Sequence, residues 1–173
     1  EGLARLLNTI VSLKEGRDYI CSSKNQVKSN FVSSVSKQLE TSSNVSMSLE
    51  MQIVILQKLS IRKEQRKVMI VNGLLQSISK LLINRRSELS TYCMEYTFAL
   101  FMNLCLEEEA HLKCSEDPSY IIQVFFCLLD EVQDNYMPYV TGALYSILSE
   151  KSVEKEALRQ DLDVLLFRQM KVG

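Results

Sequence analysis

The chain has 173 residues, of which 46% are hydrophobic and 24% are charged, and its formal net charge is −1. This composition is ordinary for a soluble protein, and the length is sufficient to bury a sizeable core. Its most apolar stretch, residues 120–129, is too short to cross a bilayer, and no charged-then-apolar leader is recognised, so we expect no membrane insertion. Five cysteines without a CxxC pair favour reduced thiols in a cytoplasmic protein.

The N-terminal third is predicted to contain helices around a serine-rich segment. Residues 3–13 carry apolar side chains at helical spacing, and Gly16 is expected to interrupt that pattern before a short second helix. Residues 22–48 contain ten serines, a composition that favours loops and frayed helix ends. We therefore predict a partly flexible segment with one amphipathic helix, which is marked by the four-residue spacing of Phe31, Val35 and Leu39.

From residue 49 onward the helical pattern is continuous, and no segment alternates in the manner of a strand. Gly73 is expected to form a turn with positive φ. Asp117 and Pro118 are expected to form an N-cap followed by proline at the first helical position, and Pro138 opens a later helix in a similar way. The predicted helices cover residues 49–59, 64–71, 74–83, 92–105, 118–129 and 138–148, followed by a charged segment at 152–159 and an apolar one at 164–170.

Three of these segments end on equivalent leucines. Leu59, Leu104 and Leu148 lie 45 and 44 residues apart, and a weaker copy ends near Leu13. A period in the mid-forties is typical of armadillo and HEAT repeats. The sequence therefore predicts an all-α, armadillo-like α-solenoid, a right-handed superhelix, formed by residues 1–173 as one repeat domain. Because Glu1 lies within a helical pattern, we expect the chain to be a fragment of a longer solenoid.

Charge is distributed unevenly along this expected stack. Residues 1–86 contain 14 Lys and Arg against 6 Asp and Glu, a net charge of +8, whereas residues 87–173 contain 6 against 15, a net charge of −9. Because the order along a solenoid is its order in space, a basic end and an acidic end are expected. Solvated helix faces explain most exposed charges. The alternatives are steering of an acidic partner and head-to-tail association between copies.

Several segments resemble armadillo units. Gly73 with residues 74–82 and the run ALFMNL at 99–104 resemble the glycine and the second and third helices of the unit. Residues 3–20, 95–106 and 138–149 are more narrowly similar to the armadillo region of a LisH-domain-containing family of the cilium and basal body. The resemblance implies a non-enzymatic scaffold of the cytoplasm and cytoskeleton. It further implies support of ciliary assembly, stability and Hedgehog signalling in complex with a TOG-array microtubule-binding protein.

The expected partner site is the concave face that the third helices form. Peptide-binding importins resemble this layout but use repeated Trp and Asn, whereas this chain has no Trp, so nuclear-import cargo is a poor fit. Asn103 has two interpretations, a hydrogen bond to a ligand backbone or a structural contact between repeats. Four tyrosines also have two interpretations: they are anchors of an interface, or they pack in the core with the hydroxyl at its rim. They are Tyr92, Tyr96, Tyr139 and Tyr145. The candidate partner-binding residues are Lys58, Tyr96, Asn103 and Tyr145.

A second hypothesis is electrostatic binding of a polyanion, either the acidic tails of tubulin or nucleic acid. The residues concerned are Arg62, Lys63, Arg66, Lys67, Arg85 and Arg86. No aromatic residues are interleaved with them, which argues against single-stranded nucleic acid. No catalytic, cofactor or metal site is expected, because the chain has one histidine, His111, without the four-ligand spacing of a zinc site, and its five glycines are scattered.

Overall fold

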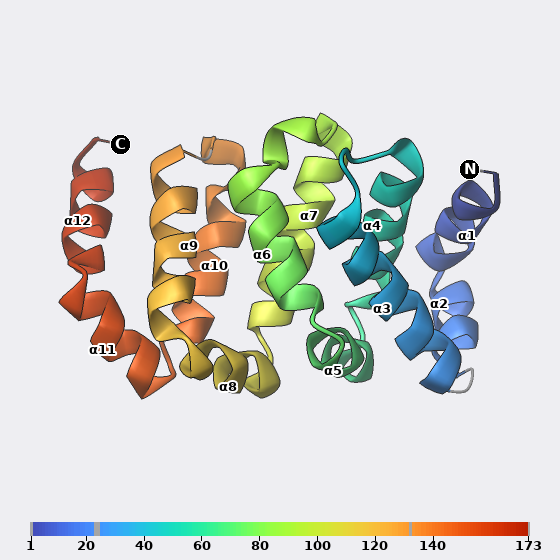
Figure 1. Cartoon of the computed structure of the whole chain (residues 1–173), viewed down its shortest axis with the longest axis horizontal. Coiled ribbons are helices and arrows are strands. Elements are labelled where there is room, and N and C mark those ends of the chain that lie inside the picture. The colour runs from blue at the N-terminus through green and yellow to red at the C-terminus, as the bar shows by residue number, and fades with distance from the viewer. Residues whose placement is uncertain (1, 23–24, 132, 173) are drawn as a thin grey trace.

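A computed structural model describes residues 2–22, 25–131 and 133–172 (Figure 1). These described residues form twelve α-helices and two short 3₁₀ segments, and none of them lies in a strand, which confirms the predicted all-α class. No described helix combines the length and apolar character that a bilayer-spanning helix needs.

The helices follow a repeating order of three. The first helices of the units are nine residues each: α2 (Lys14–Ser22), α5 (Lys63–Val71), α8 (Glu108–Glu116) and α11 (Lys151–Arg159). The second helices are α3 (Asn25–Thr41), α6 (Leu74–Asn84), α9 (Pro118–Glu131) and α12 (Leu162–Val172). The third helices are α4 (Met47–Leu59), α7 (Thr91–Cys105) and α10 (Met137–Ile147), and α1 (Gly2–Ser12) occupies the corresponding place before them. The 3₁₀ segments η1 (Arg86–Glu88) and η2 (Asp134–Tyr136) precede α7 and α10.

Equivalent helices of successive units lie side by side. The third helices pack in the order α1, α4, α7 and α10, and the second helices pack in the order α3, α6 and α9. In Figure 1 the first helices follow one edge of the row, and the two termini lie at opposite ends. One continuous apolar core runs between the two layers, with Phe98, Phe101 and Phe125 fully buried. Burial of this core is the main favourable contribution to folding.

The helix starts agree with the local sequence. Ser46 and Ser90 cap α4 and α7, because their hydroxyls accept hydrogen bonds of 3.2 Å from the amides of Leu49 and Cys93. Asp117 caps α9 in the same way, by accepting a 3.0 Å bond from the amide of Tyr120.

Two of the turns between first and second helices use left-handed backbone. Gly73, before α6, has φ 79°, as predicted, and Asp161 has φ 58° at the equivalent turn before α12. Aspartate tolerates this conformation better than most residues, so the two turns have the same geometry with different residues.

The prediction that Gly16 interrupts the first helical pattern is wrong. The chain breaks at Leu13, and Gly16 lies within α2. A Cβ at Gly16 would be 2.0 Å from the carbonyl oxygen of Ile10. Glycine is therefore required there because the end of α1 passes directly over α2.

The serine-rich segment contains one long helix. α3 covers Asn25–Thr41 and buries Val32, Val35 and Leu39 against the core. Ser23 lies outside the described residues. The predicted flexibility of this segment stays a prediction.

Candidate functional site: the third-helix face

The third helices present one continuous surface, which we call the third-helix face. It bears half-exposed or exposed apolar side chains on each of α4, α7 and α10: Met47, Tyr92 and Tyr145 are 53%, 47% and 85% exposed. The face comprises Met47, Lys58, Tyr92, Tyr96, Asn103, Leu106 and Tyr145. All four residues predicted to bind a partner belong to it.

Lys58 connects three successive third helices. Its Nζ donates hydrogen bonds of 2.7 Å to Asn8 Oδ1 and 2.7 Å to Ser12 Oγ on α1. The same ammonium lies 5.7 Å from the ring centroid of Tyr96 on α7, which is within cation–π range. Lys58 is therefore already engaged by neighbouring repeats.

Asn103 and Tyr96 also make contacts within the face. Asn103 Nδ2 donates a 2.9 Å hydrogen bond to Ser60 Oγ, which follows α4. Its contact in the structure is therefore the structural one, between repeats. The rings of Tyr92 and Tyr96 lie 4.8 Å apart at 51°. The hydrogen bond with Tyr92, followed by burial, raises the pKa of the Tyr96 hydroxyl.

Tyr145 differs from the other three predicted residues, because it is 85% exposed and makes no side-chain hydrogen bond to any described residue. It lines an open groove of about 590 Å³ together with Leu106, Gly142 and two serines. Leu106 is itself 50% exposed. At Gly142 a Cβ would lie 3.0 Å from the sulfur of Met102, so the small residue allows α10 to approach α7 closely. This groove therefore places the exposed Tyr145 ring beside a second exposed apolar side chain, Leu106.

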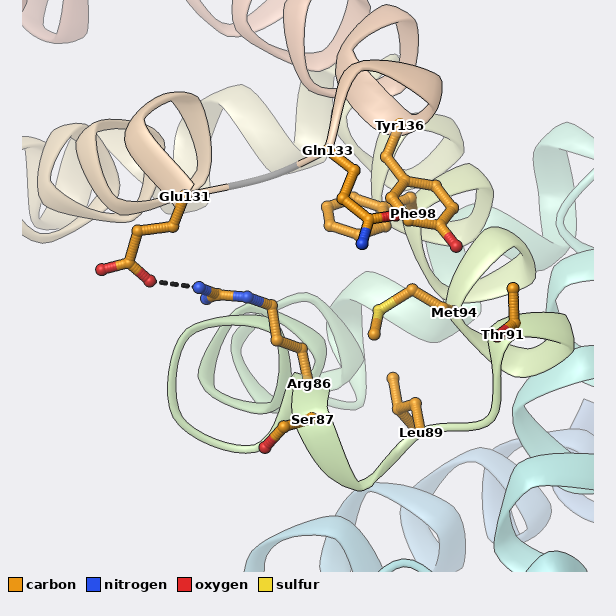
Figure 2. A pocket seen from close by; sticks show the side chains of 9 residues that line it. All are labelled: Arg86, Ser87, Leu89, Thr91, Met94, Phe98, Glu131, Gln133 and Tyr136. Carbon is orange, nitrogen blue, oxygen red and sulfur yellow. Dashed lines mark hydrogen bonds and ion pairs between the residues drawn. The ribbon is translucent and has the colours of Figure 1, made fainter.

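A second pocket, of about 240 Å³, lies at the edge of the same repeat joint, between η1, α7, the end of α9 and η2 (Figure 2). Phe98 and Tyr136 stack beside it with ring centroids 5.0 Å apart at 16°. Figure 2 shows Arg86 and Glu131 forming an ion pair across its other side. The pocket thus has an apolar lining and a charged rim. Sequence reasoning did not indicate it, because its residues come from four separate elements, η1, α7, α9 and η2.

The predicted polyanion-binding residues are mostly paired within the chain. Five of the six form ion pairs: Arg62 with Asp18, Arg66 with Glu107 (2.6 Å), Lys67 with Glu109 (2.5 Å), Arg85 with Glu88 (2.8 Å) and Arg86 with Glu131. Lys63 alone of this set has no ion pair to a described residue. Contact with Glu109 raises the pKa of Lys67, and Lys67 in turn lowers the pKa of Glu109.

These polar contacts follow the repeat period. The residues joined in Arg62–Asp18, Arg66–Glu107 and Arg86–Glu131 are 44, 41 and 45 positions apart. The partners in Asn103–Ser60 and Tyr139–Glu95 are 43 and 44 positions apart. Basic residues of one unit therefore contact acidic residues of an adjacent unit, which neutralises at the joints part of the charge asymmetry of the sequence.

One structural role recurs in the first helices and was missed from the sequence. Arg17 donates to the carbonyls of Val11 and Ser12 at the end of α1, and Arg66 donates to those of Ser60 and Ile61 at the end of α4. The ring of His111 occupies the same place, with Nε2 3.0 Å from the carbonyl oxygen of Cys105. The signal in the sequence is a polar side chain six residues after a carbonyl at the end of the third helix, where carbonyls need donors.

The neighbourhood of His111 does not assemble a metal site. No group of three or more His, Cys, Asp or Glu side chains suited to a metal occurs within the described ranges. Burial raises the pKa of the Cys114 thiol to about 12 and that of Cys105 well above its ordinary value. Such thiols stay protonated at neutral pH and are poor nucleophiles and poor metal ligands.

Stacked three-helix units with one continuous core define an armadillo-like α-solenoid, a class whose extended surfaces serve protein–protein interaction. A sequence profile described as "LisH domain-containing protein ARMC9, ARM repeats" matches residues 69–173. The chain belongs to this family.

Curated relatives agree with the family profile. The chain is 36% identical to LisH domain-containing protein ARMC9 of Danio rerio over 163 residues, which cover 94% of the chain and 19% of that protein. The Homo sapiens protein of the same name is 34% identical over 166 residues, 95% of the chain and 19% of that protein. The Bos taurus protein is 33% identical over 163 residues, 94% and 24% respectively. The chain thus spans about a fifth to a quarter of the length of these relatives. No solved structure gives a significant match.

Proposed function

We propose that the chain is a non-enzymatic scaffold whose third-helix face binds an extended segment of a protein partner. The observation that carries this proposal is Tyr145, an 85% exposed aromatic side chain beside the groove of about 590 Å³. Large aromatic side chains without a partner in the free protein are frequent anchors of interfaces. Lys58, Tyr96 and Asn103 belong to the same face, where Lys58 contacts the ring of Tyr96 and Asn103 contacts Ser60.

We further propose that this scaffold acts in the cytoplasm, at the ciliary basal body and the cytoskeleton. There it would support ciliary assembly, stability and signalling in complex with a TOG-array microtubule-binding protein. Two considerations support this proposal: membership of the family, and an armadillo-like surface suited to holding another protein.

The test is affinity capture from ciliated cells with a tagged chain. The double variant Tyr145→Ala and Leu106→Ala is compared with Leu158→Ala, whose leucine is 59% exposed on α11, outside the third-helix face. We expect the double variant to lose the ciliary partners and Leu158→Ala to retain them. An unchanged partner list for the double variant would contradict a binding role for this face.

Polyanion binding is the competing proposal, and it depends on cations that are free to pair with an external ligand. Because five of the six candidates already contact carboxylates, Lys63 is the principal cation left for such a ligand. Microtubule co-sedimentation in graded salt separates the two proposals. We expect no salt-dependent pelleting. Pelleting at low salt that disappears when the six charges are reversed would favour the polyanion instead.

A further inference from the structure

A third pocket lies in the layer that the second helices form, away from the third-helix face. Its volume is about 190 Å³, and its lining comes from α6, α8 and α9 together with Asp117, which joins the last two. Leu75, Cys114 and Ile121 in this lining are 2%, 5% and 3% exposed, so the apolar walls are parts of the packed core. The pocket therefore belongs to the joint at which α6 packs against α9 of the next unit.

Two buried polar atoms that face this pocket lack a hydrogen-bond partner. They are Oε1 of Gln76 on α6 and the hydroxyl oxygen of Tyr120 on α9, and neither forms a hydrogen bond with any described residue. Buried polar atoms in folded proteins nearly always have such a partner, because an unpaired atom loses its hydration without compensation. Two unpaired atoms from successive units in one pocket therefore point to a group that enters it from outside.

The two atoms differ in what they require of that group. The amide oxygen of Gln76 only accepts hydrogen bonds, so the group must bring a donor. Burial, and after it the charge of Asp117, raises the pKa of the Tyr120 hydroxyl, which therefore stays protonated at neutral pH. This hydroxyl donates, so the group must also bring an acceptor.

The remaining polar side chains of the lining exclude an ionised ligand. Lys113 and Glu116 pair with each other at 2.8 Å, and Asp117 accepts the hydrogen bond that caps α9. An anion would meet the carboxylate of Asp117, and a cation would meet the ammonium of Lys113. Either ion would also lose hydration against the apolar walls. The complementary group is therefore neutral and carries both a donor and an acceptor.

We propose that this pocket binds a neutral primary carboxamide, whose N–H donates to Gln76 Oε1 and whose carbonyl oxygen accepts from the Tyr120 hydroxyl. Asparagine and glutamine side chains carry this group, and so do small free amides. The volume of about 190 Å³ is below that of pockets for drug-sized ligands and suits one such group. The site is independent of the proposed function, because no residue of the third-helix face lines it.

A pair of small probes tests the donor requirement. Propionamide and 2-butanone have the same shape and the same carbonyl, but 2-butanone has a methyl group in place of the NH₂. The chain is titrated with each probe and followed by ¹H–¹⁵N NMR. We expect saturable shifts at the lining residues, millimolar affinity for so small a ligand, and about fivefold to tenfold tighter binding of propionamide. No saturable shift would mean that the pocket holds only water, and this result or equal affinity would overturn the proposal.

Two variants assign the two hydrogen bonds. Gln76→Leu removes the acceptor and should bind both probes equally. Tyr120→Phe removes the donor and should bind both probes more weakly while it keeps the preference for propionamide, because both probes carry the carbonyl. A preference that persists in Gln76→Leu, or unchanged affinities in Tyr120→Phe, would contradict the assigned contacts.

Matched controls remove the same chemical groups outside the pocket. Gln123→Leu changes an exposed residue of α9, and Tyr139→Phe changes a tyrosine of α10. Both should bind the two probes as the unaltered chain does. The dispersion of each NMR spectrum shows that the variant is folded. A loss of preference in Gln123→Leu equal to that in Gln76→Leu would contradict the role of the pocket.

Charged probes and a peptide complete the test. Propionate and propylammonium should bind more weakly than propionamide, and tighter binding of either ion would overturn the choice of a neutral ligand. A short Gly/Ser peptide with one central Gln is then compared with propionamide. Tighter binding of the peptide identifies a partner's side chain as the occupant, and tighter binding of propionamide identifies a small molecule.

Discussion

At the scale of single residues, the most informative positions are those that satisfy the ends of the third helices. Arg17, Arg66 and His111 each contact free carbonyls at the end of the preceding third helix. The sequence suggested a polyanion contact for Arg66, but its position in the repeat, which Arg17 and His111 share, explains where its side chain lies. Chemistry inferred from residue type alone was therefore less informative than position within the repeat.

Gly16→Ala should destabilise the chain. The added Cβ would lie 2.0 Å from the carbonyl oxygen of Ile10, so α1 and α2 must separate. We expect a loss of about 1–3 kcal/mol in the free energy of unfolding, the range for overpacked sites. Urea denaturation followed by circular dichroism measures it. Gly2→Ala, where a Cβ meets nothing within 4 Å, is the control and should leave stability unchanged.

The five cysteines should divide into two classes of reactivity. Cys93, Cys105 and Cys114 are buried, whereas Cys21 and Cys127 are partly exposed. Burial raises the pKa of the Cys93 and Cys114 thiols to about 12, so roughly one molecule in ten thousand carries either thiolate at pH 8. In native protein at that pH, maleimide should modify two thiols rapidly, and denaturant should expose all five. Rapid modification of Cys105 in the native state would contradict the packing of α7 against α8.

At the scale of elements, the stack depends on polar contacts between equivalent helices. Glu50 on α4 is 9% exposed and accepts bonds from Ser90, 2.6 Å from its amide and 2.9 Å from its hydroxyl. Ser90 is the N-cap of α7, so a carboxylate of one unit stabilises the start of the third helix in the next.

Glu50→Gln should therefore cost about 1.5–3 kcal/mol, the usual range for a hydrogen bond to a charged group. Chemical denaturation measures this loss. Glu95→Gln is the matched control, because Glu95 is exposed and its described contact is a 3.4 Å bond from Tyr139. A comparable loss in both variants would show that the position of Glu50 is unimportant.

Two Arg–Glu pairs between units differ mainly in burial and allow a paired test. Glu107 is 4% exposed and pairs with Arg66, while Glu131 is 57% exposed and pairs with Arg86. Removing the buried carboxylate leaves a desolvated guanidinium, so Glu107→Gln should cost about 3 kcal/mol. Glu131→Gln should cost less than about 1 kcal/mol. Thermal and urea unfolding of both variants measure the difference, and equal losses would contradict it.

The predictability of these elements depended on whether their signals were local. Apolar periodicity, the Asp117 cap and the Gly73 turn each involve residues only a few positions apart, so the helices and the repeat could be predicted. The break at Leu13 could not, because the close approach at Gly16 is set by how α1 packs over α2. Likewise the hydrogen bond from Lys58 to Asn8 and the ion pair of Arg66 with Glu107 join residues 50 and 41 positions apart. Only the stacking of the units brings these residues together.

At the scale of the whole molecule, ion pairs between units neutralise part of the charge difference between the basic and the acidic half of the sequence. Ion pairs at the joints bring the basic cluster of α5 against the acidic start of α8. Sedimentation equilibrium should therefore give the same mass at low and high salt. A mass that falls as salt increases would instead show that copies associate through opposite charges.

The role of the third-helix face is tested most directly by site-specific photo-cross-linking in ciliated cells. A benzophenone amino acid is placed at Tyr145 in one chain and, in a matched chain, at Leu158 of α11. We predict a cross-linked protein partner from position 145 and none from position 158. A partner that is captured equally at both positions, or only from position 158, would contradict the proposal that the partner binds along the third helices.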